Sequence, residues 1–167
     1  KPLSKVGKNM IRLADIQHNQ QANPSTTKVA AVFAPDRSTA CSLPLYVTPV
    51  SAGFPSPAED YLEGKLDLNK HLIKHPSATF FVKVTGDSMI DVGIHEGDML
   101  IVDRALEPHD GSIVIAVVDG ELTVKRLHKK ADELLLVAEN KNYQPITIHE
   151  QTAFEIWGVV TNVIHSL

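Results

Sequence analysis

The second half of this 167-residue chain consists of short apolar segments separated by turn residues, a pattern that leaves little room for helices. Asp119-Gly120 stands between two apolar runs, and this residue pair favours a two-residue β-hairpin. Gly97-Asp98 and His109-Asp110-Gly111 supply further turns. We therefore predict six β-strands, at Thr79–Val84, Met99–Val102, Ser112–Val118, Glu121–Leu127, Glu133–Ala138 and Ala153–Ile164, the last bent near Gly158. This series predicts a mainly β fold, a compact and largely antiparallel domain.

The N-terminal region is less regular than the strand-rich half. Residues 5–17 place apolar side chains near helical spacing, which predicts one amphipathic helix. Residues 17–27 are rich in Asn, Gln, Ser and Pro and are typical of a linker, and residues 28–33 form a short apolar patch. We expect this part of the chain to act as a flexible arm.

The middle of the chain combines an edge strand, a loop and a short helix. Leu43–Val47 is a candidate edge strand, because the proline within it has no N–H to donate and a central strand needs donors on both sides. The small residues and prolines of Val50–Pro57 predict an extended, accessible loop of the kind a protease cleaves. Asp67 is a suitable N-cap for a short helix over residues 68–74.

Charge is distributed unevenly along the chain. Residues 1–40 hold six Lys/Arg against two Asp/Glu, and residues 41–167 hold ten against eighteen, so a +4 arm precedes a −8 body. An acidic body is a poor surface for nucleic acid, which is bound by clustered Lys and Arg. Two interpretations of the basic arm stay open, a contact with DNA or an acidic partner and an ordinary solvated tail.

Several classes of protein are disfavoured by the sequence. It contains no apolar run long enough for a transmembrane helix and no secretory signal pattern, so no membrane association is expected. Cys41 is the single cysteine, which excludes an internal disulfide and fits a cytoplasmic location. Because the chain begins at Lys1 and not at a methionine, we expect that a preceding segment has been removed.

Ser88 is the first candidate for chemistry. It follows the predicted strand Thr79–Val84 in the turn Gly86-Asp87-Ser88, a position that can present a nucleophilic Oγ beside unpaired backbone N–H groups. The same residues are also ordinary turn residues, so a surface turn is the competing interpretation.

Lys125 is the second candidate. Strand alternation places Leu122 and Val124 on one face, and Thr123, Lys125 and Leu127 on the other. A lysine flanked by apolar strand residues can be partly buried, and burial lowers its pKa, so that the neutral amine can accept a serine proton. The alternative is a solvated lysine on an edge strand.

Dense matches from about residue 50 to the C-terminus resemble one family. They are Gly53-Phe54-Pro55-Ser56-Pro57-Ala58-Glu59-Asp60-Tyr61, His75-Pro76-Ser77-Ala78-Thr79, Gly86-Asp87-Ser88-Met89-Ile90-Asp91, Gly97-Asp98, Leu100-Ile101-Val102-Asp103, Asp119-Gly120-Glu121 and Thr123-Val124-Lys125. These segments are similar to UmuD, which belongs with LexA and the lambda-type phage repressors among the self-cleaving Ser–Lys proteins of the bacterial DNA-damage (SOS) response.

The resemblance implies a site and a division of the chain. It implies Ser88 as nucleophile, Lys125 as base, the backbone N–H groups of Asp87 and Ser88 as oxyanion hole, and Ala52–Gly53 as the scissile bond. The expected organisation is an N-terminal arm at residues 1–42, a cleavage-site segment at 43–60 and a catalytic and dimerisation domain at 61–167. Whether the arm is the remnant of a longer N-terminal region stays open.

The resemblance also implies partners and a role. A homodimer is expected, and a RecA filament on single-stranded DNA is expected to promote self-cleavage, which would regulate an error-prone DNA polymerase. The alternative is a LexA-like repressor whose binding to operator DNA ends on cleavage. Two departures keep it open, because the arm is longer than in UmuD proteins and an Ala–Gly bond is common among the repressors.

The remaining candidates are weak. His71 and His75 are spaced i and i+4 on the predicted helix, but no third ligand is evident, so we interpret them as surface residues and predict no metal site. No Gly-rich phosphate loop is present, and no cofactor is expected. Trp157 is interpreted as a core or dimer residue.

Overall fold

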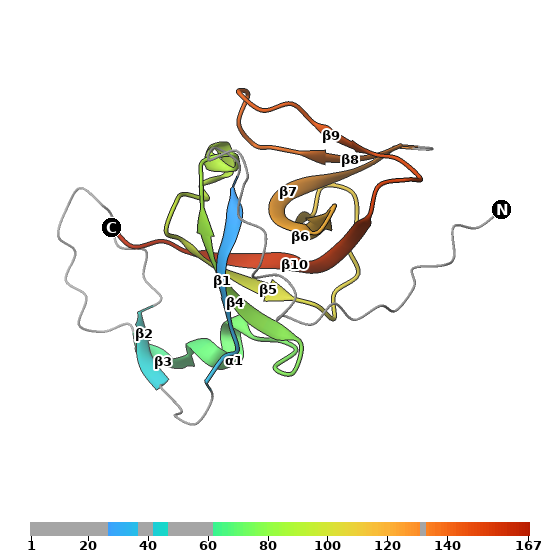
Figure 1. The fold of residues 1–167 in the computed structure, drawn as a ribbon. Helices are drawn as coiled ribbons and strands as arrows, with labels where there is room; N and C mark the ends of the chain where they lie inside the picture. Colours follow the sequence, from blue (N-terminus) through green and yellow to red (C-terminus); the bar gives the residue numbers. More distant parts are fainter. Residues whose placement is uncertain (1–26, 37–41, 47–61, 131–132) are drawn as a thin grey trace.

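The computed structural model describes residues 27–36, 42–46, 62–130 and 133–167, and Figure 1 shows their arrangement. Its elements in chain order are β1 (Lys28–Phe33), β2 (Ser42–Tyr46), β3 (Leu62–Asp67), α1 (Leu68–Leu72), β4 (Thr79–Thr85), the short 3-10 helix η2 (Ile90–Val92), β5 (Met99–Asp103), β6 (Ile113–Val118), β7 (Glu121–Lys130), β8 (Glu133–Val137), β9 (Ile146–Ile148) and β10 (Phe154–Ile164). The predicted amphipathic helix, Cys41 and the Ala52–Gly53 bond lie outside the described residues.

The main sheet has eight strands in the order β1-β4-β5-β10-β6-β7-β8-β9, and every pairing is antiparallel. β1 also pairs with β7. The strands β1, β4, β5, β10, β6 and β7 therefore curl around a shared interior (Figure 1). β2 and β3 form a separate two-stranded sheet. The mainly β, largely antiparallel fold predicted from the sequence is confirmed.

Each predicted strand of the C-terminal half is present, with ends shifted by a few residues. Asp119 and Gly120 both have positive φ, 50° and 86°, as the tight hairpin between β6 and β7 requires. Asp67 caps α1, its carboxylate accepting from the backbone N–H groups of Asn69 and Lys70. The helix ends at Leu72, earlier than predicted, so His75 lies beyond it.

β1 was predicted only as an apolar patch, yet it is a strand of the main sheet. It pairs with β4 through registers such as Val32↔Val82, and its first residue, Lys28, pairs with Thr123 of β7. This strand is stabilised by partners that are distant in sequence, a contribution that local propensity does not contain.

β10 pairs with two strands in succession. Its first half pairs with β6 and its second half with β5, and the register shifts around Gly158 and again around Thr161. A Cβ at Gly158 would lie 2.7 Å from Val102 Cγ1, so this strand passes its neighbour at a distance that only glycine allows. One of these register shifts, between Ile156 and Gly158, lies where the strand was predicted to bend.

Two apolar clusters form the core. The larger one fills the interior between the curled strands and contains Val82, Val84, Met89, Ile94, Leu100, Val102, Ile115, Val117, Leu122, Val124 and Trp157. The smaller one lies beneath β8 and contains Val114, Ala116, Leu127, Leu136 and Val159. Leu122 and Val124 belong to the first cluster and Leu127 to the second, as strand alternation predicts.

Trp157 is a core residue. It is buried, and its ring lies 5.3 Å from the ring of Phe80, with the guanidinium of Arg104 5.0 Å from its centroid. Within the described residues, no helix is both long and apolar enough to cross a membrane.

Candidate functional site

Ser88 lies in the connection between β4 and η2. Gly86, directly after β4, has φ of +85°, and this left-handed residue turns the chain out of the strand. The Asn140 side chain donates to the Asp87 carbonyl at 3.0 Å, and the Tyr143 hydroxyl donates to the Asp87 carboxylate. The segment that follows β8 thus holds the turn that carries Ser88.

Lys125 reaches Ser88 from the middle of β7. Its Nζ donates to Ser88 Oγ at 2.9 Å, to Thr123 Oγ1 at 3.1 Å and to the carbonyl of Val124 at 2.9 Å. Ser88 and Lys125 are 37 positions apart in the chain, and both are buried, with 2% of Lys125 and none of Ser88 exposed. The surface-turn and edge-strand alternatives are therefore wrong.

Burial lowers the pKa of the Lys125 ammonium from 10.5 to about 8. The cause is loss of hydration, because in the described part of the chain no carboxylate forms an ion pair with this lysine. In an appreciable fraction of molecules Lys125 is thus a neutral amine near physiological pH. Its nitrogen can then accept a proton from the Ser88 hydroxyl that it contacts.

The backbone at Thr27 covers the Ser88–Lys125 pair. The Thr27 N–H donates to Ser88 Oγ at 3.0 Å, while its carbonyl accepts from Thr123 Oγ1 and from the Val124 N–H, both at 3.3 Å. Thr27 is completely buried, although it ends the segment predicted as a linker. The backbone of Thr27, directly before β1, therefore lies against Ser88.

The proposed oxyanion donors stand beside the same hydroxyl. Within the described residues, the backbone N–H groups of Asp87 and Ser88 donate to no partner, whereas the N–H of Ile90 is already bonded to the Asp87 carbonyl. Unpaired N–H groups next to a nucleophile are what stabilisation of a tetrahedral oxyanion needs. The two residues of the scissile bond, Ala52 and Gly53, lie outside the described residues.

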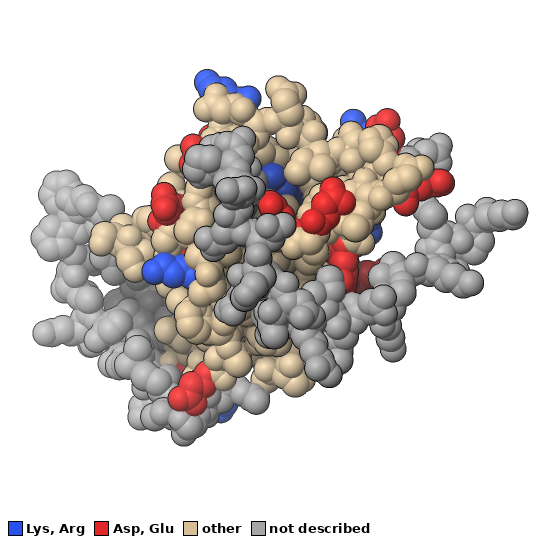
Figure 2. Space-filling view, in the orientation of Figure 1, with Lys and Arg blue, Asp and Glu red and all other residues tan. Residues whose placement is uncertain are grey.

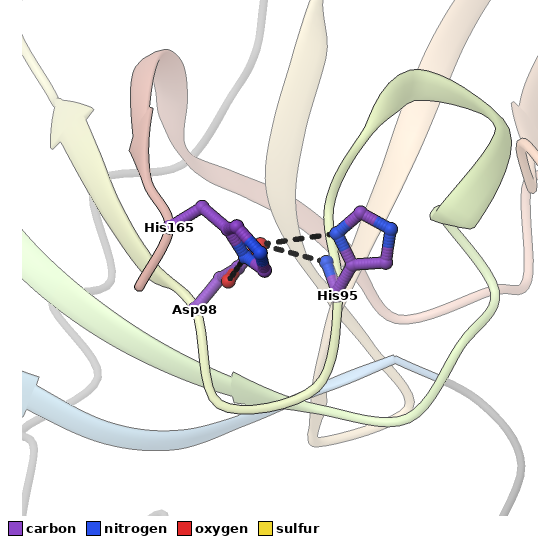
Figure 3. A group of neighbouring side chains, drawn as sticks. All are labelled: His95, Asp98 and His165. Carbon is purple, nitrogen blue, oxygen red and sulfur yellow. Dashed lines mark hydrogen bonds and ion pairs between the residues drawn. The ribbon is translucent and has the colours of Figure 1, made fainter. Parts of the chain in front are cut away.

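A second polar cluster was not anticipated from the sequence. His95, Asp98 and His165 lie together, and Figure 3 shows both imidazoles turned toward the carboxylate. Burial raises the pKa of Asp98, but hydrogen bonds from the His95 backbone and the His165 ring outweigh this effect, so its pKa is lowered. Among the described residues, the one group of three potential metal ligands is His95, Asp98 and His165.

The histidine pair singled out from the sequence does not form such a cluster. His71 and His75 are both exposed, as expected, and His75 Nδ1 lies 2.6 Å from Asp103 Oδ2. The i and i+4 spacing within one helix suggested His71 and His75. The cluster of His95, Asp98 and His165 joins residues up to 70 positions apart, which a local pattern does not reveal.

Comparison with known proteins gives one family. Residues 44–161 match the family described as Peptidase S24-like. Protein SamA of Salmonella typhimurium is 48% identical over 137 residues, which cover 82% of this chain and 93% of SamA. Protein MucA of Escherichia coli is 46% identical over 127 residues, 75% of this chain and 84% of MucA. The LexA repressor of Mannheimia succiniciproducens is 40% identical over 119 residues, 70% of this chain and 55% of the repressor.

Proposed function

The chain belongs to the S24-like peptidase family as a UmuD-like self-cleaving protein of the DNA-damage (SOS) response, and from this premise we propose that it cleaves its own Ala52–Gly53 bond with a Ser88–Lys125 dyad. The observation that carries the proposal is the 2.9 Å contact between Lys125 Nζ and Ser88 Oγ in a site closed to solvent. A buried lysine without an ionic partner is suited to act as a base, because its neutral form is accessible near pH 8.

The mechanism follows from the contacts of the dyad. Neutral Lys125 takes the hydroxyl proton, and Ser88 Oγ bonds to the carbonyl carbon of Ala52. The negative charge that develops on the Ala52 oxygen is stabilised by the Asp87 and Ser88 backbone N–H groups. Lys125 then gives its proton to the Gly53 nitrogen as the peptide bond breaks, which leaves an ester between Ala52 and Ser88. Water, deprotonated by Lys125, hydrolyses this ester and restores the hydroxyl.

Thr27 gives the reaction a preceding step. Its N–H occupies Ser88 Oγ, so the Ala52–Gly53 segment reaches the nucleophile only after Thr27 has moved away. Once the cleavage segment is in place, its attachment to the same chain supplies a high effective molarity, and a modest catalyst is sufficient.

Self-cleavage can serve either of two biological roles. The first is regulation of an error-prone DNA polymerase, with cleavage promoted by a RecA filament on single-stranded DNA in the cytoplasm. The alignments with SamA and MucA favour it, since they extend over 93% and 84% of those proteins. The second is a repressor whose operator binding ends on cleavage, and the 40% identity to a LexA repressor favours it.

The charged side chains on one face of the body do not gather by sign. On the face drawn in Figure 2, the described Lys and Arg side chains lie singly among acidic ones and do not form a continuous basic surface. That face is therefore a poor surface for nucleic acid.

A homodimer is also proposed, with its contact at the end of β10. Trp157 and Val159 of β10 are buried within the protomer, and Val160 is half-buried. Val163 and Ile164 remain 37% and 45% exposed at the end of the same strand, and they are the residues available for an apolar contact with a second copy. Sedimentation of the Val163→Glu/Ile164→Glu variant tests this, a monomer being the expected result and an unchanged dimer the contrary one.

The cleavage reaction is tested by mass spectrometry. The purified chain is incubated with RecA, ATP and single-stranded DNA, and fragments of residues 1–52 and 53–167 are expected. Ser88→Ala should yield neither fragment, whereas Ser112→Ala, which alters another buried serine, should cleave normally. Fragments from Ser88→Ala, or a product that begins at a residue other than Gly53, would contradict the proposal.

A further inference from the structure

The strand pairing between β5 and β10 brings together three potential metal ligands. Ile164 is paired with Met99 at the end of this ladder, so the next residues on each strand, Asp98 and His165, face one another. His95 belongs to the turn that precedes β5, and its own N–H donates to Asp98 Oδ2 at 2.7 Å. The β5–β10 pairing thus sets Asp98 opposite His165, and the His95 backbone N–H holds the preceding turn to the Asp98 carboxylate (Figure 3).

The ligand atoms converge on a small volume. His165 Nδ1 lies 2.6 Å from Asp98 Oδ1, and His95 Nδ1 lies 3.8 Å from Asp98 Oδ2. One ligand atom from each residue lies within 4.8 Å of the other two. Tetrahedral zinc with bonds of about 2.1 Å needs ligand atoms about 3.5 Å apart. The imidazoles are 44% and 47% exposed and can adjust by that amount.

Two features of this group of side chains suit it to a cation. His95 Nδ1 is buried and makes no hydrogen bond, although a buried polar atom normally has a partner. The Asp98 side chain is only 3% exposed, and among the described residues its ionic partners are His95 and His165 alone.

We propose that His95, Asp98 and His165 bind a divalent transition-metal ion of the zinc type. Two imidazole nitrogens and one carboxylate oxygen form a donor set that suits Zn²⁺, with water completing the coordination. The ion would neutralise the buried carboxylate and would bind His95 Nδ1, which makes no hydrogen bond.

The proposed ion would connect the last residues of the chain to the segment behind the dyad. The Asp98 carbonyl accepts from the Val84 N–H, and the Ile94 N–H donates to the carbonyl of Met89, the residue next to Ser88. Metal binding would therefore fix the end of β10 against the loop between β4 and β5. The expected effect is structural, and it does not depend on whether the dyad cleaves the chain.

The protein contains a matched control. His75 and Asp103 have the same 2.6 Å contact as His165 and Asp98, and their side chains are 47% and 4% exposed against 47% and 3%. The His75–Asp103 pair belongs to no group of three potential ligands in the described residues. A histidine substitution in each pair therefore separates a three-ligand site from a simple histidine–aspartate contact.

The test is calorimetric titration of the full chain with ZnCl₂ at pH 7.5, together with thermal melting. One zinc ion per chain is expected, and His95→Ala and His165→Ala should each weaken binding by at least about tenfold, while His75→Ala should not. Zinc at 100 times its Kd should raise Tm by about 5–10 °C. Substitution of the half-exposed His165 near the C-terminus leaves the core intact, so loss of folding does not obscure the result.

Three results would overturn the proposal. The first is the absence of one-to-one binding at 0.1 mM zinc, about the weakest affinity that a specific site of this kind would have. The second is binding that survives both His95→Ala and His165→Ala. The third is an equal loss of affinity in His75→Ala, which would assign the zinc to exposed histidines in general.

Discussion

Lys125 and Asp98 are both buried charged side chains, and the protein treats them in opposite ways. Lys125 is surrounded by a hydroxyl, a second hydroxyl and a carbonyl, and burial lowers its pKa to about 8. Asp98 accepts hydrogen bonds from the His95 N–H and the His165 ring, and its pKa is lowered, so the charge is kept. The lysine can therefore act as a base, and the aspartate as a ligand.

The two residues are about equally inaccessible to solvent, with 2% and 4% exposed, but their neighbours differ. A side chain that loses hydration without gaining an opposite charge becomes easier to neutralise. One that gains donors directed at its charged form stays ionised. The comparison predicts different responses to substitution and to pH.

The largest effect is expected from Lys125→Met, which keeps the volume and removes the amine. Self-cleavage should fall by at least about 10³-fold, because Ser88 loses its base. Folding should be retained, since an apolar side chain replaces a buried charge without an ionic partner. Mass spectrometry and thermal melting measure the two properties. The exposed lysine variant Lys83→Met is the control, and cleavage by Lys125→Met at the normal rate would exclude this residue as the base.

The pH dependence of spontaneous cleavage should follow the neutral fraction of Lys125. With a pKa of about 8, the rate should rise about tenfold between pH 7 and pH 9 and then level off. Lys125→Arg should lack this rise, because the guanidinium stays protonated. A histidine base would level off near pH 7, so a profile that is flat from pH 7 to 9 would contradict the assignment.

The same pKa predicts how stability changes with pH. The folded pKa of Lys125 is below its unfolded value of 10.5, so the unfolded chain binds more protons between pH 8 and 10.5. Its burial thus costs about 3 kcal/mol below pH 8, and this cost disappears as pH rises through that window. The contribution of Asp98 to stability changes with pH in the opposite way. Its pKa is lowered in the folded state, so its charged form stabilises the fold above the unfolded pKa, and this stabilisation is lost in acid.

Urea unfolding at a series of pH values separates the two contributions. Lys125→Met should lose the alkaline gain in the free energy of unfolding and keep the acid loss. Asp98→Asn should reduce the acid loss and keep the alkaline gain. If both variants alter the same limb of the profile, the two buried charges are not treated in the opposite ways described above.

The polar regions differ in how much of them the sequence predicts. Local patterns, a turn after a strand and a strand after a hairpin, made Ser88 and Lys125 candidates but left a surface turn and an edge-strand lysine open, and the resemblance to UmuD then implied their roles. The hairpin itself follows from Asp119-Gly120, whose backbone requirement is local. The histidine–aspartate cluster depends on the Ile164↔Met99 register, and no local pattern specifies which strands pair.

Thr27 escaped prediction for the same physical reason. Its neighbours are polar and match a linker, and its burial results from contacts with residues 61 and 96 positions away. β1 is similar, since an alanine-containing hexapeptide becomes a strand only because β4 and β7 offer it partners. Long-range contacts thus account for most of what the sequence did not indicate.

Removal of Thr27 should expose the dyad. Deletion of residues 1–27 eliminates the N–H that occupies Ser88 Oγ, and spontaneous cleavage should accelerate about fivefold, the equivalent of one net hydrogen bond. Deletion of residues 1–20 keeps Thr27 and should cleave at the normal rate. Equal rates for the two truncated chains would mean that Thr27 does not limit access.

The smallest effect is expected at Asn140, which supports the turn without contacting the dyad. Its side chain donates to the Asp87 carbonyl, so Asn140→Ala should misplace Ser88 slightly and lower the cleavage rate about threefold. Because the surroundings of Lys125 are unchanged, the midpoint of the pH profile should remain near 8. Asn140→Asp cannot donate the same bond and should be equally slow, whereas Asn140→Gln should recover part of the rate. A shifted midpoint would show that Asn140 acts on the base and not on the position of the nucleophile. The zinc affinity of Asn140→Ala should be normal, since the histidine–aspartate cluster is held by the β5–β10 pairing and not by this loop.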